Sequence, residues 1–194
     1  MAKFFGNLHL VLAIGLVAAI VVIMAFAGVT NIEGGARGMA NDVFHWLHVW
    51  FGILWIGLLY YLNFVQVPTM PKIPAELKPA ITGHIAPKVF FYFRWSALLT
   101  VITGLIIAFD SGYGIPALTF AGTHDMIGLG MWLALIMAFN VWFIIWPAQK
   151  KILGIVEATP EAKAAAAPLA LAASRTNLLL SLPMLWAMVN SNLG

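Results

Sequence analysis

Residues 126–148 read MIGLGMWLALIMAFNVWFIIWPA, and this stretch decides the class of fold. It carries no charged residue over 23 positions, and about 20 apolar helical residues are enough to cross the ~30 Å hydrocarbon layer of a bilayer. Across the chain 62% of the residues are hydrophobic and 9% are charged, whereas about 25% are charged in a typical soluble domain. The sequence therefore predicts an integral membrane protein.

Four other apolar runs of similar length surround this stretch, and the segments between the runs are short and contain glycine and proline. The runs cover approximately residues 8–29, 43–67, 89–109 and 168–190. The first run is longer than the apolar core of a secretory signal peptide, so we interpret it as a retained helix. We predict an all-α fold, an integral membrane helical bundle of five transmembrane helices that forms a single domain over residues 1–194.

The basic residues predict the orientation of this bundle. With five crossings, nine of the ten Lys and Arg residues share one side, and Arg37 alone lies on the other. The nine are Lys3, Lys72, Lys78, Lys88, Arg94, Lys150, Lys151, Lys163 and Arg175. Because cytoplasmic segments carry the excess of positive charge, we expect a cytoplasmic N-terminus and a periplasmic C-terminus. The outer side, with Glu33, Asp42, Asp110 and Asp125, is acidic.

Composition also limits the chemistry. The chain has no cysteine and five histidines, which excludes disulfides, thiolate metal sites and covalently attached c-type haem in these residues and makes histidine the main candidate metal ligand. The ten basic residues are spread along hydrophobic segments rather than gathered on one face, so nucleic-acid binding is not expected. No phosphate-binding loop or dinucleotide fingerprint is present.

The histidines suggest one cofactor. On the predicted topology His48 and His124 enter two helices from the same side, and Gly52 and Gly128 follow them by four residues, one turn deeper on the same faces. An empty glycine position beside an imidazole leaves room for a porphyrin, so the pattern predicts a b-type haem with His48 and His124 as axial ligands. His45, on the same face as His48, is a further candidate. The alternative is that both glycines serve close helix packing.

A second group of polar residues lies toward the predicted cytoplasmic half. Arg94 and Arg175 have no carboxylate in the adjoining spans, and a buried cation at that depth is costly without a partner. We therefore consider Arg94, Arg175, His84 and Asn140 as candidates for holding an anionic substrate or a haem propionate. The alternative roles are helix packing for the asparagine, snorkelling for the arginines and capping for His84.

Several motifs resemble one known family. They are Trp46-Leu47-His48 with Trp55-Ile56-Gly57, Phe93-Arg94-Trp95 with Thr103-Gly104, Asn140-Val141-Trp142 with Ile145-Trp146-Pro147, and Ser174-Arg175-Thr176-Asn177 with Ser181-Leu182-Pro183. Together they resemble the membrane domain of bacterial urate hydroxylases, the urate oxidase N-terminal family, over approximately residues 42–192. Longer members carry a C-terminal cytochrome c domain, and these 194 residues contain no Cys-x-x-Cys-His motif. A looser similarity to membrane haem proteins of the protoporphyrinogen oxidase type also implies haem ligation at His48.

These observations lead to one expected function and one alternative. We expect a haem b protein of the bacterial inner membrane that transfers electrons, either with its own urate-like substrate or as a subunit of a larger complex. Without an attached cytochrome, electron transfer requires a separate cytochrome c or subunits of a respiratory complex. The alternative is a haem-free structural or assembly subunit of a respiratory membrane complex.

Overall fold

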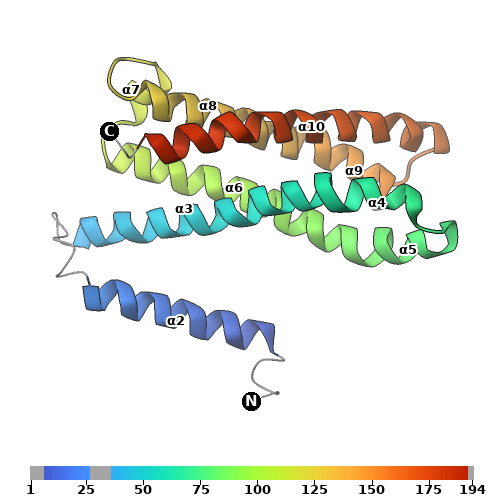
Figure 1. The fold of residues 1–194 in the computed structure, drawn as a ribbon, viewed down its shortest axis with the longest axis horizontal. Coiled ribbons are helices and arrows are strands. Elements are labelled where there is room, and N and C mark those ends of the chain that lie inside the picture. The colour runs from blue at the N-terminus through green and yellow to red at the C-terminus, as the bar shows by residue number, and fades with distance from the viewer. Residues whose placement is uncertain (1–6, 27–35, 192–194) are drawn as a thin grey trace. The chain divides into compact units, whose positions relative to one another are not determined.

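The computed structural model describes residues 7–26 and 36–191, and their regular structure is helical (Figure 1). Lys3, Glu33 and the predicted end of the first span at residues 27–29 lie outside the described residues. The longer α-helices are α2 (Leu8–Phe26), α3 (Ala36–Tyr60), α6 (Ala86–Asp110), α8 (Asp125–Phe139) and α10 (Pro160–Asn190). Shorter ones are α4 (Val67–Thr69), α5 (Lys78–Ala80), α7 (Gly114–Leu118) and α9 (Trp146–Ile152).

Short segments of other helical types join these helices into longer runs. Three are π-helical: η1 (Tyr61–Gln66), η4 (Ile81–Ile85) and η5 (Asn140–Ile145). Two are 3₁₀-helical: η2 (Met70–Lys72) and η3 (Ala75–Leu77). Helices α3 and α4, α5 and α6, and α8 and α9 are thereby parts of three continuous rods.

Four helical runs in the described part of the chain are long and apolar enough to cross a membrane. They cover Arg37–Lys72, Ala75–Asp110, Asp125–Ile152 and Pro160–Asn190, and a shorter apolar run covers Leu8–Val22 of α2. The prediction of an all-α membrane bundle is confirmed. The four long runs extend past the predicted spans at every boundary except residue 190, where α10 also ends, because helices continue past the apolar core into the polar layer, where hydropathy no longer marks them.

The last helix shows how such an extension begins. The predicted start was residue 168, but α10 begins at Pro160, eight residues earlier. The side chain of Thr159 accepts a hydrogen bond from the backbone N–H of Ala162, at 3.2 Å, and proline at the first helical position needs no donor partner. A capping threonine followed by proline is the local signal that sets this boundary.

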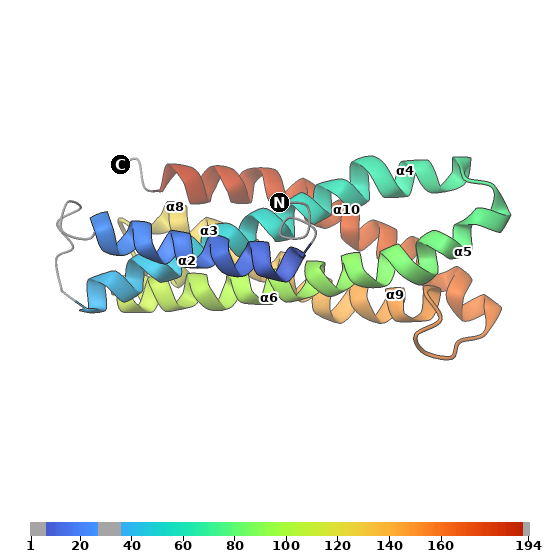
Figure 2. The same cartoon turned by 90° about the horizontal axis from the view of Figure 1, so that it is seen from below.

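The chain divides into two compact units, Met1–Val43 and Phe44–Gly194, and each is described by itself. In the first, the residues of α2 are apolar on all sides apart from His9 near its start, as expected for a helix surrounded by lipid. In the second, α10 packs along α8 and α9, and α7 packs against α8 (Figures 1 and 2). Everything below concerns residues 44–191.

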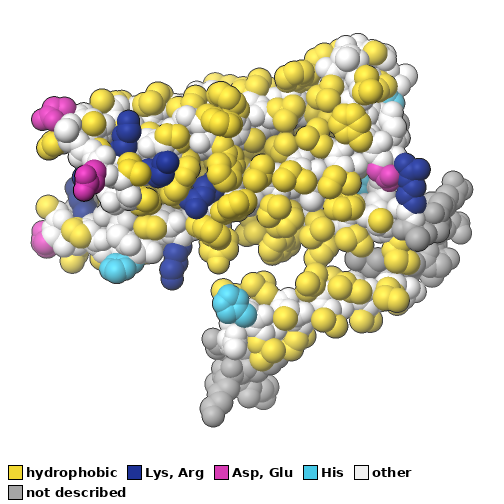
Figure 3. Space-filling view, turned by 180° about the vertical axis from the view of Figure 1, so that it is seen from behind, with side chains coloured by type: hydrophobic (Ala, Val, Ile, Leu, Met, Phe, Trp, Pro, Cys, Tyr) yellow, Lys and Arg dark blue, Asp and Glu magenta, His cyan; other side chains and the backbone are white. Residues whose placement is uncertain are grey.

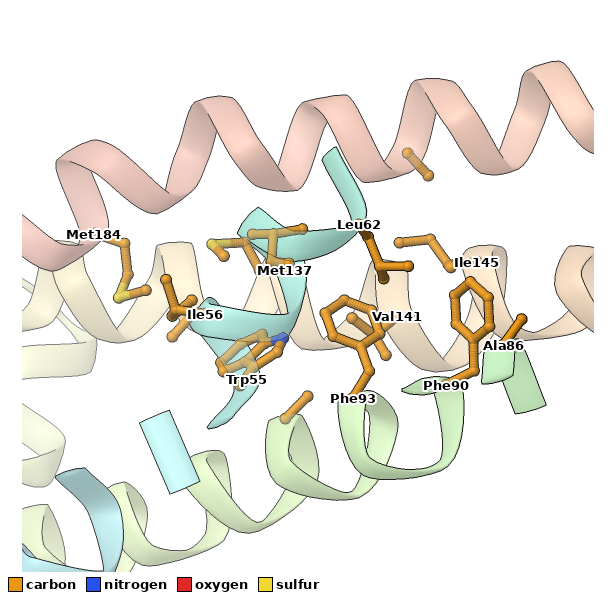
Figure 4. Close-up of a cluster of buried hydrophobic side chains, with 14 residues drawn as sticks. Trp55, Ile56, Leu62, Ala86, Phe90, Phe93, Met137, Val141, Ile145 and Met184 are labelled. Atoms are coloured by element: carbon orange, nitrogen blue, oxygen red, sulfur yellow. The ribbon is translucent and has the colours of Figure 1, made fainter. Parts of the chain in front are cut away.

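The core of the second unit joins all four long runs. Trp55 and Leu59 of α3, Phe93 of α6, Met137 of α8 and Met184 of α10 belong to one cluster. Figure 4 shows the side chains of Trp55, Phe93, Met137 and Met184 between the helices. Four alanines are buried in the same cluster, Ala86, Ala97, Ala134 and Ala173, which suits membrane helices, since small side chains let backbones come together where no hydrophobic effect drives packing.

The two ends of this unit differ in charge. Every Lys and Arg of residues 44–191 lies toward the end formed by α4, α5 and α9, hereafter the α9 end, and Figure 3 shows most of the dark blue side chains over that half. Asp110 and Asp125 lie at the opposite end, beside α7, hereafter the α7 end. By the positive-inside rule this distribution favours a cytoplasmic α9 end. The orientation itself stays a prediction.

Candidate functional site

A cavity of about 560 Å³ opens between α3, α6, α8 and α10 in the half of the bundle toward the α7 end. Its walls are mainly aliphatic, and the polar groups that reach it come from His45, His48, Trp55, Tyr60, Thr100 and Tyr113. A volume of this size and a lining with few polar groups are typical of sites for small organic ligands and cofactors.

His48 is held in one orientation at this cavity. Its Nδ1 lies 2.9 Å from the backbone carbonyl oxygen of Thr100. Because a carbonyl oxygen only accepts hydrogen bonds, Nδ1 carries the proton and donates, which leaves the lone pair on Nε2. A histidine that ligates a metal commonly donates its other ring N–H to a carbonyl in this way. The arrangement therefore fits a ligand to a metal centre.

Gly104 of α6 makes room for the imidazole. A β-carbon added at Gly104 would lie 2.8 Å from Cε1 of His48 and 3.1 Å from Nδ1, so any larger residue would displace the ring. Sequence analysis missed Thr100 and Gly104 as partners of His48. The Thr103-Gly104 pair was present among the motifs, but which helix faces His48 follows only from the packing of α3 against α6.

The predicted companions of His48 on α3 also reach the cavity. Gly52 lines it, and its nearest neighbour at the β-carbon position is Cγ2 of Thr100 at 3.9 Å, an ordinary contact. His45 lines the cavity one turn farther out, and its side chain is exposed. The predicted grouping of His45, His48 and Gly52 on one face of a helix therefore coincides with the wall of a cavity.

The predicted residues on the α8 side lie elsewhere. A β-carbon added at Gly128 would overlap the carbonyl oxygen of Ala117, so the space beside Gly128 holds the backbone of α7. His124 directly precedes α8, with its ring centroid 5.5 Å from that of Tyr113, and it is not among the residues that line the cavity. The structure gives Gly128 a packing role, and pairing of His124 with His48 stays a prediction.

Two further polar groups reach the cavity. Trp55 is fully buried, and its Nε1 has no hydrogen-bond partner. An indole N–H buried without an acceptor costs free energy, and an acceptor on a bound ligand would remove that cost. Burial raises the pKa of Tyr113, so its hydroxyl group stays neutral and able to donate.

The four candidates toward the α9 end do not form one site. His84 and Arg175 are exposed. Arg94 places its guanidinium group over the ring of Trp146, 3.8 Å from the ring centroid. Asn140 donates from Nδ2 to Oδ1 of Asn177 at 2.9 Å, so its role in the structure is to join two helices.

The remaining asparagines continue this cross-helix network. Asn177 is fully buried and donates from Nδ2 to the carbonyl oxygen of Met137 at 2.9 Å. Asn63 donates to the carbonyl oxygen of Leu59 and to Oγ of Ser174, each at 2.9 Å. Asn63 and Asn140 both lie in π-helical segments, whose changed backbone hydrogen bonding often accompanies specialised positions.

The side chains that could ligate a metal limit the kind of metal site that the described residues can form. In the described part of the chain no group of three or more His, Asp or Glu residues is placed to hold a metal ion. A haem brings its own four nitrogen ligands and requires only axial ligands from the protein. His48, with Nδ1 anchored and Nε2 available beside an apolar cavity, fits that requirement.

Comparison with protein-family models gives one match, to the urate oxidase N-terminal family over residues 113–193. This confirms the resemblance for the motifs at Asn140–Trp142, Ile145–Pro147, Ser174–Asn177 and Ser181–Pro183. The matched urate oxidase N-terminal segment begins at Tyr113, so it contains His124 but not His48. No curated protein and no solved structure matches the chain.

Proposed function

We propose that this membrane protein binds a b-type haem in the cavity between α3, α6, α8 and α10 and takes part in electron transfer. The observation that carries the proposal is the state of His48, whose Nδ1 donates to Thr100 while Nε2 is left available at an apolar cavity. The family match supports a redox role, because the name of the family refers to urate oxidation.

Each residue of the site has a definite part in this proposal. His48 would supply a nitrogen ligand to the haem iron, and the Thr100 carbonyl group and Gly104 would hold its ring in place. The buried N–H of Trp55, which has no partner in the protein, would donate to an oxygen acceptor on the bound haem. When bound, the haem would supply reversible one-electron chemistry at iron. The mainly aliphatic walls would contact the apolar faces of the bound group.

Two observations bear on what the electrons would come from and go to. The family name makes urate or a related purine the first candidate reductant. These 194 residues contain no cysteine that could attach a haem covalently, and we propose that the next carrier is a cytochrome c or a subunit of a respiratory complex. We place the protein in the bacterial inner membrane, where such carriers are found.

Absorption spectra of the purified full-length protein, oxidised and reduced with dithionite, test the proposal. We expect a Soret band and sharp α and β bands on reduction. His48→Ala should lower haem content at least about ten-fold, because loss of supporting ligand interactions alone typically costs 10–100-fold in affinity. His45→Ala, a change of the same kind one turn away, should retain the haem.

The outcomes separate the candidate functions. Absence of a Soret band from protein purified with haem supplied would reject the proposal in favour of a haem-free structural or assembly subunit. Haem retention by His48→Ala would reject the ligand assignment. Reduction of the haem by added urate would identify an oxidoreductase with its own substrate, whereas reduction by a partner cytochrome alone would identify an electron-transfer subunit.

A further inference from the structure

A cation with no anion lies on the side of the bundle where α6 meets α9. Arg94 of α6 is partly exposed, and its guanidinium carbon lies 3.8 Å from the ring centroid of Trp146 and 5.4 Å from that of Phe91. These distances are those of cation–π contacts, which attract the charge to the ring face. They hold the guanidinium group in one place on the surface.

The aromatic rings leave the hydrogen-bonding capacity of Arg94 unused. A guanidinium group has five N–H donors in a planar fork that matches phosphate and carboxylate. Among the described residues, the structure gives this group no carboxylate or carbonyl acceptor and only the two ring contacts. Unpaired donors are unfavourable within a bilayer, so an acceptor from outside the protein would be bound favourably.

The depth of Arg94 identifies where that acceptor comes from. Arg94 precedes Asp110, the end of α6, by 16 residues, or about 24 Å along the helix axis at 1.5 Å per residue. A hydrocarbon layer of ~30 Å measured from Asp110 would end near residue 90. Arg94 therefore lies just inside the hydrocarbon boundary at the α9 end, within reach of lipid headgroups.

Neighbouring side chains extend this position into a stripe on the surface of α8, η5 and α9, hereafter the Arg94 stripe. The indole N–H of Trp142 donates to the backbone carbonyl oxygen of Arg94 at 3.0 Å and ties η5 to α6. Lys150 follows Trp146 by four residues, one turn closer to the α9 end. In the other direction Phe143 and Phe139 continue the same stripe, their rings stacked at 4.8 Å and both more than half exposed.

We propose that the Arg94 stripe binds one anionic phospholipid. Its phosphate pairs with the guanidinium group of Arg94 and with Lys150, and an acyl chain lies along Phe143 and Phe139. An anionic lipid is favoured over a zwitterionic one because two cations lie at the site and the described structure pairs no carboxylate with Arg94. The site needs no haem, so it can be tested independently of the function proposed above.

Native mass spectrometry of the delipidated full-length protein tests this site with two lipids of the same chains. We expect dioleoyl phosphatidylglycerol to be retained about 30-fold more strongly than dioleoyl phosphatidylcholine, the factor given by about 1 kcal/mol for each of the two cations. Arg94→Gln should lower the preference to about five-fold, because Lys150 remains. Arg175→Gln, which removes an exposed cation of α10, is the matched control and should keep the full preference.

A further variant and a competition with phosphate exclude simpler explanations of the lipid preference. Arg94→Lys keeps the charge without the planar fork and should keep part of the preference, and it replaces Arg94→Gln if that variant does not fold. Inorganic phosphate should not displace the lipid, because it makes no contact with the phenylalanines. Equal retention of the two lipids by the wild type, an equal loss in Arg175→Gln, or displacement by phosphate would each overturn the proposal.

Discussion

The two halves of the bundle use most of their polar residues in different ways. Neither half is fully paired, since Oδ1 of Asn63 and Oε1 of Gln66 toward the α9 end are buried without a hydrogen-bond partner. Toward the α9 end, Asn140, Asn177 and Asn63 each donate a hydrogen bond of 2.9 Å to a neighbouring helix. Toward the α7 end, the indole N–H of Trp55 has no partner, and His48 leaves one ring nitrogen available beside a cavity. Polar groups that satisfy each other hold helices together, whereas groups left unsatisfied around a cavity are available to a ligand.

The largest expected effect is at the glycine that supports His48. Gly104→Val should lower haem content about 10–100-fold, because the added side chain displaces the imidazole and breaks its bond to Thr100. Gly57→Val is the matched control, since Gly57 lines the same cavity and has nothing within 4 Å of its β-carbon position. Pyridine haemochrome assays measure both. An equal loss in the two variants would remove the distinction between Gly104 and the rest of the cavity wall.

Substitution of Gly128 distinguishes a role in helix packing from a role in making space for a cofactor. Gly128→Ala should destabilise the protein by about 1–3 kcal/mol, as overpacking does, because the new methyl group meets the backbone of Ala117. The loss should be the same with and without haem. Gly52→Ala should cost much less, since Thr100 lies 3.9 Å away. Thermal unfolding in detergent measures both, and a Gly128 effect that appears only with haem present would favour the original cofactor role.

Substitution of Asn177 tests the network of hydrogen-bonded asparagines toward the α9 end. Asn177→Ala removes two hydrogen bonds between helices and should cost about 1–2 kcal/mol, the range for such bonds in membranes. Haem content should be unchanged, because the network does not line the cavity. A double-mutant cycle with Asn140→Ala should show coupling between the two residues. Additive losses would argue against the hydrogen bond between them.

The smallest effect is expected at Trp55. Trp55→Phe removes an N–H that has no partner in the protein. In the haem-free protein the only loss of stability should come from the smaller packing area of phenylalanine. Haem affinity should fall about five-fold, which corresponds to one hydrogen bond of about 1 kcal/mol. Titration with haem measures this change. Unchanged affinity would mean that the indole does not bind the group, and it would leave the assignment of His48 intact.

The sequence predicted part of the candidate site. The spacing of His45, His48 and Gly52 on one helical face follows from 3.6 residues per turn, and these residues do line one cavity wall. The same argument applied to His124 and Gly128 did not place them at the cavity. Gly128 lies against α7, a five-residue helix that no apolar periodicity marks. Which surface a glycine faces depends on the neighbouring element.

The sequence by itself determined the membrane class, the all-α fold and the concentration of positive charge at one end, because these depend on composition and on periodicity along a single helix. Only the tertiary structure decided that Thr100 and Gly104 hold His48, that Arg94 stacks on Trp146, and that Asn140 bonds to Asn177. Each of these contacts joins residues from different helices. Their meeting depends on helix rotation and packing, which hydropathy along one segment does not encode.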